Sequence, residues 1–98
     1  MKIGRKEKSG ELYRAILQLK DEQECYEFFQ DLCTVPELRS MEQRFHVAYL
    51  LYKGWIYNDI LNRTGASSAT ISRVSRSLNY GTGAYGRLFA RKPLEKEP

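Results

Sequence analysis

Cysteine and long apolar runs are scarce in this sequence of 98 residues. The longest apolar run covers residues 47–52, whereas a membrane-spanning helix needs about 20 apolar residues. No apolar segment follows the basic N-terminus to form a signal peptide. Two cysteines, Cys25 and Cys33, cannot build the disulfide framework of a secreted domain. We therefore expect a cytoplasmic protein that has no membrane partner.

Histidine occurs once, as His46, which leaves little material for catalysis or metal binding. A His-dependent triad would require His46, and the sequence ties no serine or cysteine to it. Cys25, Cys33 and His46 lack the close-pair spacing of a zinc site. Residues 81–86 spell G-x-G-x-x-G, but the dinucleotide-binding pattern needs a preceding strand and an acidic residue about 20 positions later. We expect no enzyme, no catalytic residue, no metal and no cofactor.

Acidic residues are absent between positions 60 and 94. Residues 1–50 hold eight Lys/Arg against nine Asp/Glu, a net charge of −1, and residues 51–98 hold eight against three, a net charge of +5. This asymmetry predicts a polyanion-binding half and a separate acidic half. A solvated basic face without a ligand is the alternative that charge alone leaves open.

Apolar residues recur at helical spacing, and no segment alternates with period two for long enough to predict a strand. The predicted class is therefore all-α, with about six helices. The first covers residues 12–19, the second starts at Asp21, the third runs from Thr34 to about Lys53, and a short one lies near residues 85–89. Asp21 with Glu24 and Thr34 with Glu37 have capping-box spacing. On the third helix, we expect Leu38, Met41, Phe45, Ala48 and Leu51 or Tyr52 to point inward.

The domain organisation follows from length and polarity. We expect a disordered arm at residues 1–10, one helical domain at residues 11–92 and a disordered tail at residues 93–98. A domain this small buries only about two-thirds of the surface that its unfolded chain exposes. Further burial through a homodimer is therefore expected.

Residues 57–79 have the anatomy of a helix-turn-helix. The first helix runs from Tyr57 to Thr64, Gly65 supplies the turn, and the second helix begins at Ser67 or Ser68. Small side chains near the start of a recognition helix let its backbone approach base edges in the major groove. Hydroxyls, arginines and the helix N-terminus bind phosphate oxygens. An ordinary helical hairpin with serines on a wet face is the alternative.

The runs TGASSATISRVSRSLNYG, LLYKGWIYNDI and LCTVPELRSMEQR resemble the Trp repressor superfamily, and most closely its YerC/YecD-like branch. The resemblance covers about residues 11–92. It implies an all-helical, intertwined homodimer in which two helix-turn-helix units bind successive major grooves of double-stranded DNA. The implied function is a sequence-specific regulator of transcription that acts as a repressor. A protein-interaction module with a vestigial helix-turn-helix is the alternative.

The resemblance assigns site residues of the Trp repressor superfamily to matching positions of this sequence. Ser67, Ser68, Ala69 and Ser72 match the base-facing positions of the recognition helix, and Asn58 matches a first-helix position near the DNA. Adding the residues expected to bind phosphate, the predicted DNA-binding set is Asn58, Arg63, Ser67, Ser68, Ala69, Thr70, Ser72, Arg73 and Arg76.

An effector site is also implied by position. Arg44 and Arg73 match the two arginines between which Trp repressor holds its tryptophan. The next position is glycine in Trp repressor and Val74 here, and a β-branched side chain at that position intrudes into the indole site. We therefore do not expect tryptophan as the ligand, and an effector of unidentified class stays an open alternative. An ion pair of Arg44 with Glu37 or Glu42 is the structural alternative for that arginine.

Overall fold

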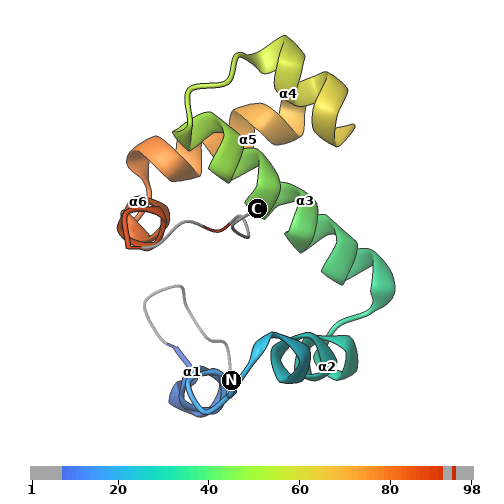
Figure 1. The fold of residues 1–98 in the computed structure, drawn as a ribbon, viewed down its shortest axis with the longest axis vertical. Helices are drawn as coiled ribbons and strands as arrows, with labels where there is room; N and C mark the ends of the chain where they lie inside the picture. The colour runs from blue at the N-terminus through green and yellow to red at the C-terminus, as the bar shows by residue number, and fades with distance from the viewer. Residues whose placement is uncertain (1–7, 92–93, 95–98) are drawn as a thin grey trace. The chain divides into compact units, whose positions relative to one another are not determined.

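The computed structural model describes residues 8–91 and Leu94. This part of the chain forms helices and no strand, which confirms the all-α prediction (Figure 1). The helices are α1 (Gly10–Ile16), α2 (Glu22–Leu32), α3 (Val35–Tyr52), α4 (Tyr57–Thr64), α5 (Ser68–Tyr80) and α6 (Ala84–Phe89). None of these described helices combines the length and hydropathy that crossing a membrane requires. The predicted arm and tail fall largely on residues 1–7, 93 and 95–98, which lie outside the described residues, as does residue 92.

The predicted capping box of Thr34 and Glu37 is complete, whereas Asp21 and Glu24 form only one of the two bonds of a box, because Glu24 bonds the Lys20 amide and not the amide of the N-cap Asp21. The Asp21 carboxylate accepts a hydrogen bond from the Glu24 amide at 2.8 Å, and Glu24 Oε1 accepts from the Lys20 amide at 3.1 Å. At the start of α3, Glu37 Oε1 accepts from the Thr34 amide at 2.8 Å, and Thr34 Oγ1 accepts from the Glu37 amide at 3.2 Å. The bonds that Asp21 and Thr34 accept satisfy amides that have no partner inside the helix, so they fix where α2 and α3 begin.

The second box makes stability depend on pH. The hydrogen bond from the Thr34 amide lowers the pKa of the exposed Glu37 carboxyl, and the Thr34 hydroxyl lowers it further. A carboxyl whose pKa is lower in the folded state stabilises that state above its unfolded pKa, and the contribution disappears as the pH falls through the folded pKa. Because glutamine also forms a capping box without a charge, Glu37→Gln is expected to be less stable than the wild type at neutral pH and equally stable in acid. Urea unfolding of both proteins at several pH values measures this, and a difference that stays constant with pH would contradict it.

The chain divides into two compact units, Met1–Leu38 and Arg39–Pro98. In the described part of the first unit, α1 and α2 contain no buried residue. Phe28 and Phe29 meet edge to face, with ring centroids 5.4 Å apart. The prediction that the first helix extends to Leu19 is wrong, because α1 ends at Ile16 and the chain turns at Leu17.

The second unit contains the hydrophobic core. Figure 1 shows α4, α5 and α6 around the C-terminal half of α3, and each of these helices contributes buried side chains. Phe89 of α6 contacts the aromatic rings of α3, with a centroid 5.2 Å from that of Tyr49 and 5.1 Å from that of Tyr52. The buried residues are Val47, Ala48, Leu50, Ile60, Ala66, Ile71, Val74 and Phe89.

The buried face of α3 differs from the predicted one. Ala48 is buried as expected, but Met41 and Phe45 are exposed, whereas Val47 and Leu50 are buried. Apolar residues lie almost all around this part of α3, so periodicity alone does not single out one face. The elements packed against the helix select the buried residues instead.

Candidate nucleic-acid interface

The predicted helix-turn-helix is formed by α4, a short turn and α5. The first helix ends at Gly65, whose φ of 72° lies in the left-handed region, and the Gly65 amide donates to the Leu61 carbonyl at 3.0 Å. Glycine adopts this conformation without the steric cost that a Cβ brings. Ala66 then buries its methyl group in the core, which anchors the turn. The chain can therefore reverse direction over three residues and begin α5 at Ser68.

Hydrogen bonds connect this turn to α3. Thr64 Oγ1 donates to the Ile60 carbonyl at 2.8 Å and accepts from the Ala66 amide at 3.1 Å. The half-buried Gln43 donates through Nε2 to the Thr64 carbonyl at 3.2 Å. Sequence reasoning missed the role of Gln43, since helical spacing carries no signal for a bond between residues this far apart. Together with the burial of Ile60 and Ile71, these bonds hold the turn on the core.

Ser67 is the N-cap of α5. Its Oγ accepts from the Thr70 amide at 3.1 Å and lies 3.1 Å from Thr70 Oγ1, to which it donates. Of the two candidates for the cap, Ser67 is therefore the one that the structure selects. This arrangement leaves Ser68 and Ala69 exposed in the first turn of the helix.

The outward face of α5 brings most of the predicted DNA-binding residues together. Ile71 and Val74 face the core, whereas the residues between and beyond them are polar or small and mostly exposed. No acidic side chain occurs along α5. We call this surface the α5 face; it consists of Ser67, Ser68, Ala69, Thr70, Ser72, Arg73 and Arg76, of which all are exposed except the half-buried Thr70.

The two predicted residues of α4 have different surroundings. Asn58 is exposed in the first turn of α4. The guanidinium carbon of Arg63 lies 5.9 Å from the ring centroid of Trp55, so Arg63 forms a cation–π contact. Arg63 and Trp55 line a cavity to which no residue of α5 contributes. Contact of either α4 residue with DNA stays a prediction.

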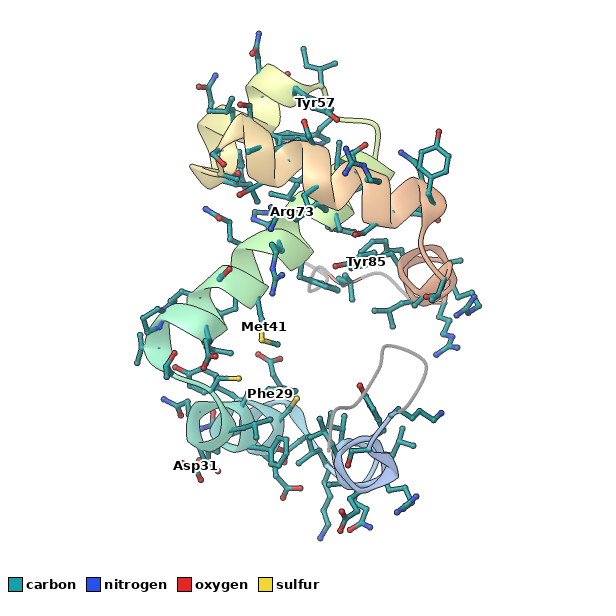
Figure 2. All side chains as sticks on the ribbon, turned by 180° about the vertical axis from the view of Figure 1, so that it is seen from behind. Phe29, Asp31, Met41, Tyr57, Arg73 and Tyr85 are labelled. Atoms are coloured by element: carbon teal, nitrogen blue, oxygen red, sulfur yellow. The ribbon has the colours of Figure 1, made fainter. Side chains whose placement is uncertain are left out.

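Arg44 and Arg73, the two predicted effector residues, line one open cleft of about 350 Å³. Figure 2 shows Arg73 on the side of α5 toward α3, and Met41 and Tyr85 line the same cleft. The alternative ion pairs of Arg44 are not observed, because Glu42 binds Arg39 at 2.8 Å and Glu37 caps α3. The lining residues are Met41, Arg44, Phe45, Arg73, Val74, Ser77 and Tyr85.

The cleft combines apolar walls with two guanidinium groups. Val74 belongs to the lining and is 4% exposed, so its branched side chain occupies space at the floor of the cleft. Guanidinium groups bind carboxylates and stack on planar groups. Among the described residues, no cluster of histidine, cysteine and acidic side chains could hold a metal ion.

Comparisons with known proteins give the family. The Trp repressor protein family matches residues 7–93. The chain is 53% identical over 88 residues to the uncharacterized protein YerC of Bacillus subtilis (strain 168), covering 89% of this chain and 85% of YerC.

Solved structures agree with this likeness. A TrpR-like protein from Eubacterium eligens ATCC 27750 superposes with a TM-score of 0.82 at 52% identity, covering 89% of this chain and 90% of that one. A proposed Trp repressor from Staphylococcus aureus has a TM-score of 0.82 at 48% identity, covering 89% of this chain and 87% of that one. Sequence, fold and helix-turn-helix geometry thus agree, and the chain belongs to the Trp repressor family.

Proposed function

We propose that this protein binds double-stranded DNA sequence-specifically through the α5 face and thereby represses transcription. One observation carries the proposal: the exposed side of α5 is small near its N-terminus, basic further along and free of acidic groups. A helix with these properties can enter the major groove without steric or electrostatic conflict. Membership of the Trp repressor family supports the same function.

The position of each residue on α5 suggests its role. Ser68, Ala69 and Ser72 lie in the first two turns of α5, the part of a recognition helix that contacts base edges, so we assign sequence readout to them. Arg73 and Arg76 lie further along the helix, where a guanidinium group reaches phosphate oxygens. The N-cap Ser67, its hydrogen-bond partner Thr70, and Asn58 and Arg63 of α4 complete the set that we assign to the DNA backbone.

The first unit supports the proposal of a homodimer. None of its described residues is buried, and Leu17 is 84% exposed and Val35 71% exposed. Helices gain most of their stability by burying an apolar face, so α1 and α2 are incomplete without a partner. A second copy of the chain supplies matching helices and two-fold symmetry. The operator is then a pseudo-palindrome with half-sites about 34 Å apart.

Sedimentation equilibrium measures the oligomeric state directly. The expected mass is twice the 11.4 kDa of the chain at micromolar concentration. A species with the mass of one chain would contradict the dimer and, with it, the two-fold symmetry expected of the operator.

DNA binding is tested by titrating the purified protein with duplexes while the salt concentration is raised. Neutralisation of phosphates by arginine makes affinity fall steeply with salt, with a logarithmic slope of about 0.9 for each phosphate contact. Arg76→Ala is expected to weaken binding to all duplexes and to lower this slope by about one. Lys20→Ala, which removes a basic residue from the first unit, is the matched control and is expected to keep the wild-type slope.

Other outcomes of this titration identify other functions. A loss confined to one base pair would make Arg76 a base reader, and an absence of affinity at low salt would instead support a protein-interaction module. The titration is first done without small molecules. Binding that requires an added amino acid or aromatic acid would show that an effector acts on the protein, and the Arg44–Arg73 cleft is the candidate site for it.

A further inference from the structure

One polar residue stands on the core-facing side of α3. Gln43, Val47 and Leu50 follow one another at helical spacing, and Val47 and Leu50 are buried in the core. Gln43 lies one turn before Val47 and is half-buried. The side of a helix that faces the core is ordinarily apolar. The amide group of Gln43 therefore calls for a role other than filling space.

This amide group bonds a carbonyl for which α4 itself provides no donor. Thr64 is the last residue of α4, and the final carbonyls of a helix have no amide within the helix to bond. Gln43 Nε2 donates to the Thr64 carbonyl at 3.2 Å, although the two residues are 21 positions apart in the sequence. The bond therefore joins α3 to the point where the turn of the helix-turn-helix begins.

From Thr64, further contacts lead to the start of the recognition helix. Thr64 Oγ1 accepts from the Ala66 amide at 3.1 Å, and Ala66 is buried. The next residue, Ser67, is the N-cap of α5. Ser68 and Ala69, to which we assign sequence readout, follow directly. A shift of the Thr64 carbonyl relative to α3 thus reaches the proposed base readers within a few residues of chain.

We propose that Gln43 is a positioning residue for DNA recognition, because its bond to the Thr64 carbonyl sets the position of the first turn of α5 relative to α3. This role rests on the proposed DNA binding, and it acts through the turn rather than through contact with a base. Base readout requires side chains held within about 0.5 Å of their productive geometry, whereas phosphate contacts carry no sequence information. Gln43 therefore affects the discrimination between operator and other DNA.

Gln43→Met tests the proposal, because methionine is a flexible, unbranched side chain without a hydrogen-bond donor. The full-length variant is titrated by fluorescence anisotropy with a duplex from binding-site selection and with a random duplex. The ratio of the two affinities is expected to fall about tenfold, the effect of one poor base contact. Affinity for the random duplex is expected to stay within about twofold of the wild type, since it depends on phosphate contacts.

The wild type in the same titration separates the two proposals. If it discriminates between the duplexes and Gln43→Met does so equally well, the positioning role is overturned and the proposed function stands. If the wild type binds both duplexes equally, the proposed function is overturned and the role of Gln43 with it.

Val47→Ala separates positioning from stability. Val47 has no exposed surface, so its truncation leaves a cavity and destabilises the fold. At the half-buried Thr64, water can bond the carbonyl when the Gln43 amide is removed. In urea unfolding, Val47→Ala is therefore expected to lose more stability than Gln43→Met, yet to keep the wild-type affinity ratio. Affinity ratios that fall in proportion to stability in both variants would show a merely structural role and overturn the proposal.

Gln43→Lys returns a hydrogen-bond donor to this position. The lysine ammonium has three N–H donors, and its added charge raises the affinity for both duplexes, so that it cancels in their ratio. We expect this variant to recover most of the wild-type ratio. A loss as complete as that of Gln43→Met would show that the donor is irrelevant, which would overturn the proposal.

Nuclear magnetic resonance of the DNA-free protein measures the bond itself. The side-chain amide protons of Gln43 are expected to exchange with solvent more slowly than those of Gln30, which is exposed on α2. Equal exchange at the two glutamines would overturn the proposal without any reference to DNA, and it would leave the proposed function untouched.

Discussion

Ala69→Glu is expected to lower the affinity for operator DNA by a factor of at least about 100, because the phosphates of the DNA repel a carboxylate on the α5 face. Ala69 is exposed in the first turn of α5. A carboxylate there interacts favourably with the helix dipole, so the fold is expected to be as stable as that of the wild type. Fluorescence anisotropy with a labelled duplex from binding-site selection measures the affinity.

Ala69→Gln separates charge from size. Glutamine has the length of glutamate without its charge. Ala69→Gln is therefore expected to lower the affinity for the selected operator by about tenfold or less, which is the cost of one poor base contact. It is also expected to leave binding to random duplexes unchanged, since that binding depends on phosphate contacts. If Ala69→Glu binds the operator like the wild type, α5 does not enter the groove and the proposed function is wrong.

Ile71→Ala is expected to reduce the free energy of unfolding by about 3 kcal/mol, since truncating a buried aliphatic side chain leaves a cavity. Ile71 of α5 has no exposed surface and belongs to the cluster of buried core residues. A loss of this size is a large fraction of the stability of a small domain, which is about 5–15 kcal/mol. Urea unfolding at one protein concentration measures it, because the stability of an oligomer depends on concentration.

Two substitutions serve as controls for this prediction. Ile71→Val removes one methylene and is expected to cost about 1 kcal/mol. Leu61 lies on α4, and its side chain is 37% exposed. Leu61→Ala is therefore expected to reduce the free energy of unfolding by less than Ile71→Ala does. Equal losses in Ile71→Ala and Leu61→Ala would show that Ile71 is not part of the core.

The helix-turn-helix could be predicted closely because its boundaries depend on local chemistry. Gly65 ends α4 in the left-handed conformation, and Ser67 caps α5, so α4 covers the predicted residues and α5 begins at one of the two predicted positions. Such signals act over three or four residues. The Asp21 cap of α2 and the capping box of α3 are confirmed for the same reason.

The end of α1 was predicted wrongly because periodicity indicates which residues can share a face, not where hydrogen bonding stops. Leu19 has the helical spacing, but the helix ends at Ile16. The Lys20 amide then donates to Glu24, which fixes the approach of the chain to α2. The start of one helix therefore limits the length of the helix before it.

The sequence by itself determined the all-α class, the caps and the acid-free outward side of α5, because these depend on residue type and short spacing. The tertiary structure decided which residues of α3 are buried, brought Arg44 and Arg73 to one cleft and placed Arg63 over Trp55. Those features depend on contacts between residues distant in the chain. Such contacts form only when helices pack, and the spacing of residues along one helix carries no information about them.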